Sequence, residues 1–298
     1  MKRLAISLCL VIVVAVVIWL SVRPHGLPAN ALPQHTADTS NGQRLFHAGG
    51  CASCHASPAE EENPGLLGGG LAMDTAFGVF RVPNISPDPS SGIGGWTALD
   101  FINAMKQGVS PDGRHYYPAF PYASYTRMSM EDLLDLKSYL DTLPAVKTQN
   151  ERHELKFPWN IRWGIGFWKL VNLDDEEVAS DLPVTPKVSR GRYLAEGAGH
   201  CGECHTRRNW TGGLDKSRWL AGAANPDGEG RIPNITPQAK GLGGWSEEDI
   251  AYYLQSGFTP DFDTVGGSMV EVQENLTHLP VEDLEAIAAY LKAIPPLQ

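Results

Sequence analysis

The sequence is poor in basic residues and in cysteine, and it shows no motif for substrate catalysis. Lys and Arg number 24 against 34 Asp and Glu, which gives a net charge of −10. Because nucleic-acid-binding domains present a basic surface, this charge argues against that class of protein. A nucleotide-binding loop, a Ser/His/Asp set and a paired-carboxylate site are all missing, so we expect no catalytic side chain. The length of 298 residues predicts about two domains.

Charge is also missing from residues 4–22, directly after Lys2 and Arg3. This run is close to the roughly 20 apolar residues that span a bilayer as a helix, whereas a cleaved signal peptide has an apolar part of about 7–15 residues. We therefore expect a membrane anchor over residues 1–23 and a linker over residues 24–40. Ala29-Asn30-Ala31 keeps a cleaved signal peptide as the alternative. The basic pair predicts a cytoplasmic start, with the rest of the chain on the periplasmic side of a bacterial inner membrane.

Of the five cysteines, Cys9 lies in the apolar run and the other four form two pairs. The pairs belong to two C-x-x-C-H signatures, Cys51-Ala52-Ser53-Cys54-His55 and Cys201-Gly202-Glu203-Cys204-His205. This signature attaches c-type haem. Cysteines one helical turn apart share a face and can each bond a vinyl group, while the histidine ligates iron. We therefore predict two covalently bound haems c, with His55 and His205 as iron ligands.

Other uses of paired cysteines fit less well. A zinc ribbon needs its cysteine pairs about 15–20 residues apart, and these pairs lie in different halves of the chain. A thioredoxin-like redox pair needs a βαβ context, and no strand-rich pattern surrounds either pair. Haem attachment is therefore the favoured interpretation.

The two signatures belong to an internal repeat, which predicts the architecture. The matching segments are Arg81-Val82-Pro83-Asn84-Ile85-Ser86 with Arg231-Ile232-Pro233-Asn234-Ile235-Thr236, and Gly94-Gly95-Trp96 with Gly243-Gly244-Trp245. We expect an all-α protein in which an N-terminal transmembrane helix precedes two tandem cytochrome c domains. The predicted domains cover residues 41–145 and 189–298, and an aromatic-rich connector covers residues 146–188.

Each half is predicted to contain the same helices. A short helix leads into each signature, near residues 42–46 and 191–194. A second helix follows each Trp, begins with a capping box at Thr97 or Ser246 and ends near Gly108 or Gly257. A third helix has a buried apolar stripe and ends before Pro144 or Pro295. Long loops rich in Gly and Pro join these helices.

Four residues of the repeated loops are candidate partners of the haem propionates. They are Arg81 and Arg231, whose guanidinium groups suit carboxylates, and Asn84 and Asn234, which can donate hydrogen bonds. The alternative is that these side chains stabilise the loops, a common use of Asn in turns.

The second axial ligand of iron is predicted from a methionine in a loop. Met269 follows two glycines between the last two predicted helices, and we expect it to ligate the second iron. The equivalent position in the first half is Phe120, which cannot ligate. Three hypotheses remain for the first iron: Met128 or Met130 rearranges to ligate it, with Met128 ranked first, His115 ligates it, or it is five-coordinate.

The connector contains Phe157-Pro158-Trp159-Asn160-Ile161-Arg162-Trp163-Gly164-Ile165-Gly166-Phe167-Trp168. We expect these aromatic side chains to pack between the two domains. The alternative is contact with a membrane or a partner, since Trp favours such boundaries.

The sequence resembles the cytochrome c subunits of bacterial membrane-bound alcohol, aldehyde and gluconate-type dehydrogenases. The segments that carry the resemblance run from about residue 40 to the C-terminus: Pro83-Asn84-Ile85-Ser86, Gly94-Gly95-Trp96, Tyr116-Tyr117-Pro118-Ala119-Phe120-Pro121-Tyr122, Ser124-Tyr125, His200-Cys201-Gly202-Glu203-Cys204-His205 and Gly266-Gly267-Ser268-Met269. Those subunits usually carry three haems, and a methionine where Phe120 stands. The resemblance implies electron transfer from a periplasmic dehydrogenase towards quinone, a terminal oxidase or another cytochrome.

Two other functions stay open at this stage. An open first haem would suit an enzyme, such as a peroxidase or a cytochrome that oxidises sulfur compounds. A sensor or assembly factor would instead exchange electrons slowly with dehydrogenases and oxidases.

Overall fold

The computed structural model describes residues 2–58, 63–183, 185–225, 228 and 230–298. Residue 1 of the predicted anchor, residues 59–62, 226, 227 and 229 of the predicted domains and residue 184 of the connector lie outside this description. The helices are α1 Lys2–Val22, α2 Thr39–Ala48, α3 Cys51–His55, α4 Ala98–Ile102, α5 Tyr122–Tyr125, α6 Met130–Leu140, α7 Ile165–Asn172, α8 Pro186–Tyr193, α9 Gly202–His205, α10 Glu247–Ser256, α11 Met269–Leu276 and α12 Val281–Ala293. Two π-helical segments, Asn103–Gln107 and Leu194–Ala198, extend α4 and α8, and short 3₁₀ turns cover Ala29–Ala31, Arg162–Gly164 and Lys216–Arg218.

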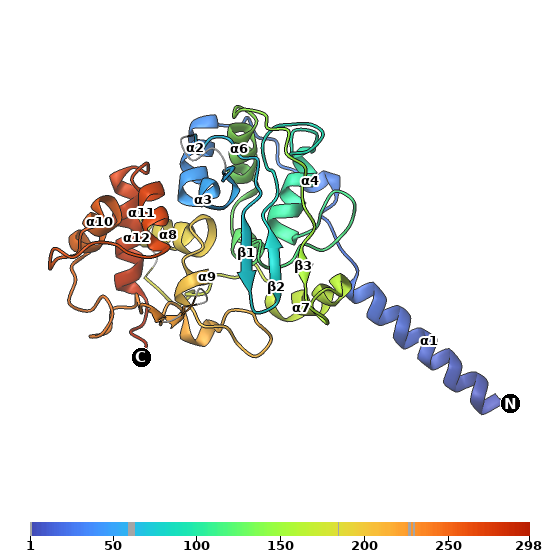
Figure 1. Ribbon diagram of the computed structural model, residues 1–298. Helices are drawn as coiled ribbons and strands as arrows, with labels where there is room; N and C mark the ends of the chain where they lie inside the picture. Colours follow the sequence, from blue (N-terminus) through green and yellow to red (C-terminus); the bar gives the residue numbers. More distant parts are fainter. Residues whose placement is uncertain (1, 59–62, 184, 226–227, 229) are drawn as a thin grey trace.

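Helix α1 projects alone from the body, as Figure 1 shows. It is long and apolar enough to cross a bilayer over Arg3–Val22, and its large apolar side chains are exposed. Residues 3–21 are exposed and Val22 is buried. The carbonyl oxygen of Val22 lies 2.8 Å from Nε2 of the buried His115. Helix α7 lies against the same end of α1. The first half of the chain therefore holds the end of α1.

The predicted helices are present in both halves. Thr97 and Ser246 each form a capping box, with the carboxylates of Asp100 and Asp249 accepting from the cap amides. Gly108 and Gly257 end these helices in the left-handed region, with φ of 57° and 78°. Ser129 caps α6 as expected, since its hydroxyl accepts from Asp132 N at 3.1 Å.

The prediction of an all-α protein is wrong for the loops, which contain short strands. One antiparallel sheet joins β1 Ala72–Thr75, β2 Gly78–Arg81 and β3 Glu154–Leu155, and a second pairs β4 Ala223–Ala224 with β5 Arg231–Ile232. Gly78, at φ 120°, lets the backbone of β2 approach Glu154 closely. One of these pairings, β2 with β3, joins segments far apart in the chain. Strands β3, β4 and β5 have two residues each, which is too short for hydrophobic periodicity to mark them.

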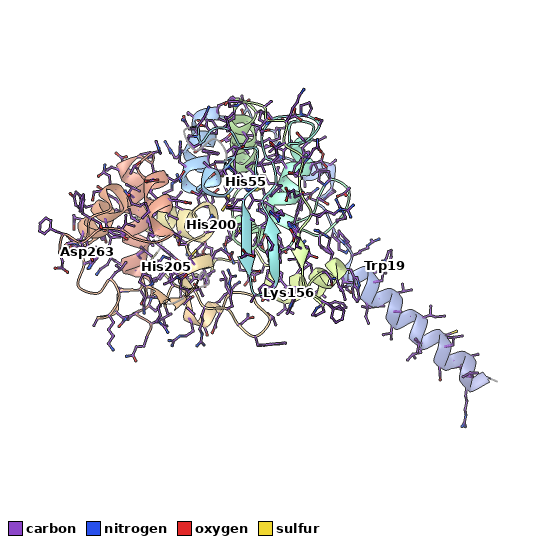
Figure 2. The ribbon with its side chains drawn as sticks, in the orientation of Figure 1. Trp19, His55, Lys156, His200, His205 and Asp263 are labelled. Atoms are coloured by element: carbon purple, nitrogen blue, oxygen red, sulfur yellow. The ribbon has the colours of Figure 1, made fainter. Side chains whose placement is uncertain are left out.

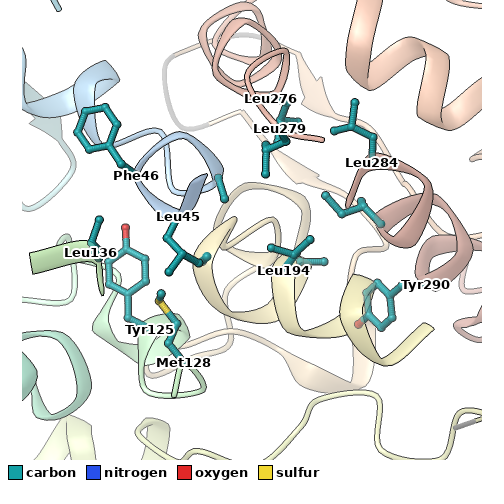
Figure 3. Close-up of a cluster of buried hydrophobic side chains, with 14 of the residues drawn as sticks. Leu45, Phe46, Tyr125, Met128, Leu136, Leu194, Leu276, Leu279, Leu284 and Tyr290 are labelled. Carbon is teal, nitrogen blue, oxygen red and sulfur yellow. The ribbon is translucent and has the colours of Figure 1, made fainter. Parts of the chain in front are cut away.

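The two halves meet through a continuous apolar core. Leu45, Tyr125 and Met128 of the first half lie on one side of Leu194, and Leu276, Leu284 and Tyr290 of the second half lie on the other (Figure 3). Elements α2 to α7 and elements α8 to α12 form the two sides of the body (Figure 1). The ends of the two leading helices touch, because a Cβ on Gly49 would lie 3.3 Å from the carbonyl oxygen of Ala198.

Contrary to the expectation, the aromatic side chains of the connector are not packed between the two halves. Phe157 is 78% exposed and Trp163 is 62% exposed. Trp168 instead packs edge-on against Tyr122 within the first half. Most of these side chains therefore form a surface rather than an interdomain core.

Candidate haem sites

Each C-x-x-C-H signature forms a short helix with its histidine fixed by a distant carbonyl. In the first half, His55 Nδ1 lies 2.8 Å from the carbonyl oxygen of Pro83. In the second half, His205 Nδ1 lies 2.9 Å from the carbonyl oxygen of Pro233. A carbonyl only accepts, so Nδ1 carries the proton and Nε2 keeps its lone pair. This is the tautomer and orientation that a ligating imidazole needs.

Burial favours the neutral forms of the first cysteine and of the histidine in each signature. Burial raises the pKa of Cys51 and of Cys201 to about 12. Burial also lowers the pKa of His55 and of His205. Cys51 and Cys201 form no disulfide. Figure 2 shows His55 and His205 in the central part of the body, where the two halves meet.

The first signature lies close to residues of the second half. Desolvation raises the pKa of Cys54, and the charges of Glu271 and Cys204 raise it further, so both groups lie near this thiol. Asn275 of α11 donates from Nδ2 to Ser53 Oγ at 3.1 Å. Residues of the second half therefore reach the cysteine-bearing face of α3.

Beside Cys51 the structure has a small, mostly apolar cavity. Its lining residues are Leu45, Gly49, Cys51, Met105, Tyr125, Met128, Leu136 and Ala198. Met128 is 1% exposed, and burial raises the pKa of Tyr125 well above its usual range. Two thioethers, from Met105 and Met128, are thus available in the first half on the side of Cys51. The cavity lies where a covalently attached porphyrin would begin.

The other candidate ligands lie in different surroundings. Nε2 of His115 is hydrogen-bonded to the carbonyl oxygen of Val22. Met130 is the first residue of α6. Phe120 packs in a group of tyrosine rings that includes Tyr116 and Tyr125. Met269 was expected in a loop but is the first residue of α11, and it is partly buried against the core. The loop expectation is wrong although Ser268-Met269-Val270-Glu271 fits the capping-box pattern, which marks the start of a helix. In the structure the Ser268 side chain makes no capping hydrogen bond.

Comparisons with known proteins decide between the uses of these motifs. Residues 39–144 match the cytochrome c family. A dihaem c-type cytochrome from Cereibacter sphaeroides is 50% identical over 299 residues, which is 100% of this chain and 99% of that protein. The chain belongs to the dihaem c-type cytochrome family. Covalently bound haem c follows from this membership.

Cytochrome subunits of dehydrogenases are also similar to this cytochrome. The fructose dehydrogenase cytochrome subunit of Gluconobacter japonicus is 36% identical over 90% of this chain and 54% of that subunit. The gluconate 2-dehydrogenase cytochrome c subunit of Pantoea cypripedii is 35% identical over 85% of this chain and 58% of that subunit. The resemblance seen in the sequence is confirmed, although the chain spans only about half the length of these subunits.

The residues of this cytochrome fit haem c. The donor set is two thiols one turn apart and an imidazole whose Nε2 is left available, and an apolar cavity with buried thioethers adjoins the first thiol. Haem iron supplies one-electron redox chemistry when bound. The backbone carbonyls of Pro83 and Pro233 hold the histidine tautomer, and mostly apolar side chains line the cavity and fix the position of the thioethers.

Three of the four candidate propionate partners make contacts that stabilise the loops. Arg81 donates to Glu154 Oε1 at 2.6 Å. Asn84 donates to the carbonyl of Val146 at 2.7 Å, and Asn234 donates equivalently to that of Leu297 at 2.7 Å. These contacts are those of the loop-stabilising alternative. Arg231 lies exposed on β5. Propionate binding by these residues stays a prediction.

Three residues of these sites, Pro83, Pro233 and Met105, are not among those predicted from the sequence. Pro83 and Pro233 each follow their histidine by 28 residues, and this repeated spacing was a usable signal. Met105 lies at the place in the repeat where the second half has Leu254, so a thioether replaces an alkyl chain there. Its position on the cavity wall required the packing of the π-helical segment against α5, which has no local signal.

Proposed function

We propose that this cytochrome carries two haems c and moves electrons on the periplasmic side of a bacterial inner membrane. The observation that carries the proposal is the repeated His–Pro contact behind each signature, His55 with Pro83 and His205 with Pro233. Each contact prepares one imidazole for iron. A chain with two such sites suits electron transfer, because the protein sets haem orientation and access while the cofactor does the redox chemistry.

The proposed ligands are the same residue types in both halves. His205 and Met269 would ligate the second iron. His55 and Met128 would ligate the first iron. The alternative to Met128 is Met105, whose thioether lines the same cavity. Methionine as second axial ligand raises the reduction potential. An enzyme-like open first site is disfavoured by Met128 and Tyr125, whose buried side chains close the cavity beside Cys51.

The proposed location rests on α1. At about 1.5 Å per residue, its 21 residues span about 31 Å, which matches a hydrocarbon core of roughly 30 Å. The basic residues before the apolar run favour a cytoplasmic N-terminus. The haem-bearing body would then lie in the periplasm, tied to the membrane by the packed end of α1.

The proposed donor is a periplasmic or membrane-bound dehydrogenase, and the acceptor is quinone, a terminal oxidase or another cytochrome. Support comes from the relatives that are named as cytochrome subunits of fructose and gluconate dehydrogenases. The acidic surface of the chain would steer a basic docking face on the donor.

The test uses membranes of the native host with the full-length cytochrome, the same membranes without it, and a C201S/C204S variant as the matched control. Addition of the dehydrogenase substrates fructose, gluconate or ethanol should reduce the wild-type haem within the turnover time of the dehydrogenase. The variant should retain one haem and pass electrons onward more slowly. Haem that stays oxidised with every substrate, while an artificial acceptor is reduced, would remove the proposed donor class.

A further inference from the structure

Several large apolar side chains of the connector, which joins the two halves in the sequence, are exposed. Six of them form what we term the connector patch: Phe157, Trp159, Trp163, Phe167, Leu170 and Val171, with exposed fractions of 78%, 51%, 62%, 41%, 62% and 67%. Trp163 and Phe167 contact each other edge to face at 5.6 Å. A cluster of large apolar side chains on one surface indicates an interaction site.

The two cationic side chains of this segment, Arg162 and Lys169, are bound to the body. Lys169 of α7 donates to the carbonyls of Gln107 and Gly108 at 2.6 and 2.8 Å. Arg162 donates to the carbonyl of His115 at 2.8 Å and lies over the ring of Tyr117. Helices at the surface of soluble domains normally bury their apolar face and expose the polar one. Here the cations are anchored in the body, so the apolar side chains face outward.

The connector patch begins at the end of α1. A Cβ on Gly166 would lie 2.0 Å from the carbonyl oxygen of Val22, so the backbones of α7 and α1 are in direct contact. Figure 1 shows α7 beside the point where α1 leaves the body. Trp19 in the last turns of α1 is 58% exposed, with Arg23 above its ring. Trp and Arg at the end of an apolar helix are typical of the membrane–water interface.

The length of α1 determines how deep α7 lies relative to the bilayer. If α1 spans the bilayer, Val22 lies where the hydrocarbon meets the headgroups. A helix in direct contact with that end lies within about one helix diameter, roughly 10 Å, of the same boundary. Aromatic side chains with apolar bodies are favoured at this depth.

We propose that the connector patch docks on the periplasmic leaflet of the bilayer, with its aromatic side chains inserted at the boundary of headgroups and acyl chains. This inference rests on the proposed anchoring by α1 and adds a second, surface contact with lipid. Two contacts fix the orientation of the body, whereas a single helix would leave it free to swing. The first half then lies beside the membrane at a constant distance.

The test is photolabelling of the full-length holoprotein in nanodiscs of phosphatidylethanolamine and phosphatidylglycerol. A trace phospholipid carries a photoactivatable diazirine on its acyl chain, and adducts are located by mass spectrometry. Peptides of α1 and of residues 157–171 should both be labelled several-fold above the peptide with Phe262, which is 89% exposed in the second half. The double variant W163Q/F167Q should lower labelling of Phe157 and Trp159 several-fold, because the apolar driving force is removed. The control Y252Q/F262Q should leave labelling unchanged, with the same haem content in both variants.

The outcomes separate the two proposals. Labelled α1 with connector peptides at the level of Phe262 overturns the docking proposal and leaves the anchor intact. Unlabelled α1 refutes the anchor, and the docking proposal with it. Connector labelling that falls as protein is raised at constant lipid means that a second copy covers the patch, which also overturns membrane docking.

Discussion

Gly42 of α2 lies directly against the backbone of Asp135 in α6, where a Cβ would be 2.0 Å from the Asp135 carbonyl oxygen. The second half repeats the relationship: a Cβ on Gly191 of α8 would be 1.8 Å from the carbonyl oxygen of Ala286 in α12. In both halves a glycine therefore sets the crossing distance of the helix before the haem signature and the last helix.

Replacing either glycine with alanine should force these helices apart. We expect Gly42→Ala and Gly191→Ala each to lower the free energy of unfolding by about 1–3 kcal/mol or more, since neither neighbour is a movable side-chain end. Gly244→Ala is the matched control, because nothing lies within 4 Å of its added Cβ. Urea unfolding followed by helical circular dichroism measures all three. Equal stabilities for Gly42→Ala and Gly244→Ala would contradict the close packing.

Asp135 should make stability depend on pH in the acid range. Its carboxylate is desolvated, yet hydrogen bonds from Asn41, His35 and the amide of Asp38 outweigh this and lower its pKa. A carboxyl with a lower folded pKa contributes fully above its unfolded value of about 3.9, and the contribution is lost as pH falls through the folded value.

Asp135→Asn should therefore lower stability most at neutral pH and flatten its decline below about pH 4. The exposed Glu131, in the same helix, provides the control Glu131→Gln. Free energies of unfolding measured across this range check both variants. A decline of the same steepness in Asp135→Asn and wild type would show that this carboxyl is not responsible.

Tyr290 joins two buried polar groups of the second half. Its hydroxyl donates to Glu196 Oε1 at 2.7 Å and accepts from Trp219 Nε1 at 2.8 Å. Tyr290→Phe leaves both partners without this contact, which should cost about 1–3 kcal/mol of stability. Tyr252→Phe, on the exposed face of α10, should change stability little. Thermal unfolding of the oxidised protein is the measurement, and a neutral Tyr290→Phe variant would argue against this buried network.

Met128→Leu should change the first haem and leave the second as it is. Leu occupies the corresponding position of the second half, Leu279, so packing is preserved and stability should fall by less than about 1.5 kcal/mol. Loss of the thioether should convert one haem of two to high-spin ferric iron and lower its potential. Met105→Leu and Met130→Val are the companion variants. Electron paramagnetic resonance with redox titration reads out each one, and an unchanged low-spin pair in Met128→Leu would assign the ligand elsewhere.

Local signals were sufficient for much of the fold. Capping boxes at Thr97 and Ser246, and the glycines that end the same helices, depend on neighbouring residues and were predicted correctly. The role of the C-x-x-C-H histidines as iron ligands could also be predicted, because the haem-attachment signature consists of five consecutive residues. By contrast, β3 pairs with β2 across more than 70 residues, and no periodic pattern marks two-residue strands.

The connector shows why composition alone misleads about burial. Its aromatic residues were expected to form an interdomain core, because large apolar side chains are usually buried. Which side chains are exposed depends on the hydrogen-bond acceptors of Lys169 and Arg162. These acceptors are the backbone carbonyls of residues 107, 108 and 115. Such carbonyls are supplied by the fold, so the sequence could not reveal which face of α7 turns outward.

The most direct test of the account is the haem count and iron ligation of the full chain matured in a host that attaches haem c. Mass spectrometry and the pyridine haemochrome assay should give two haems for the wild type and one each for C51S/C54S and C201S/C204S. Electron paramagnetic resonance of the oxidised protein should show two low-spin irons. A wild-type chain with one haem, or with none, would contradict the proposed pair of His–Pro-supported sites.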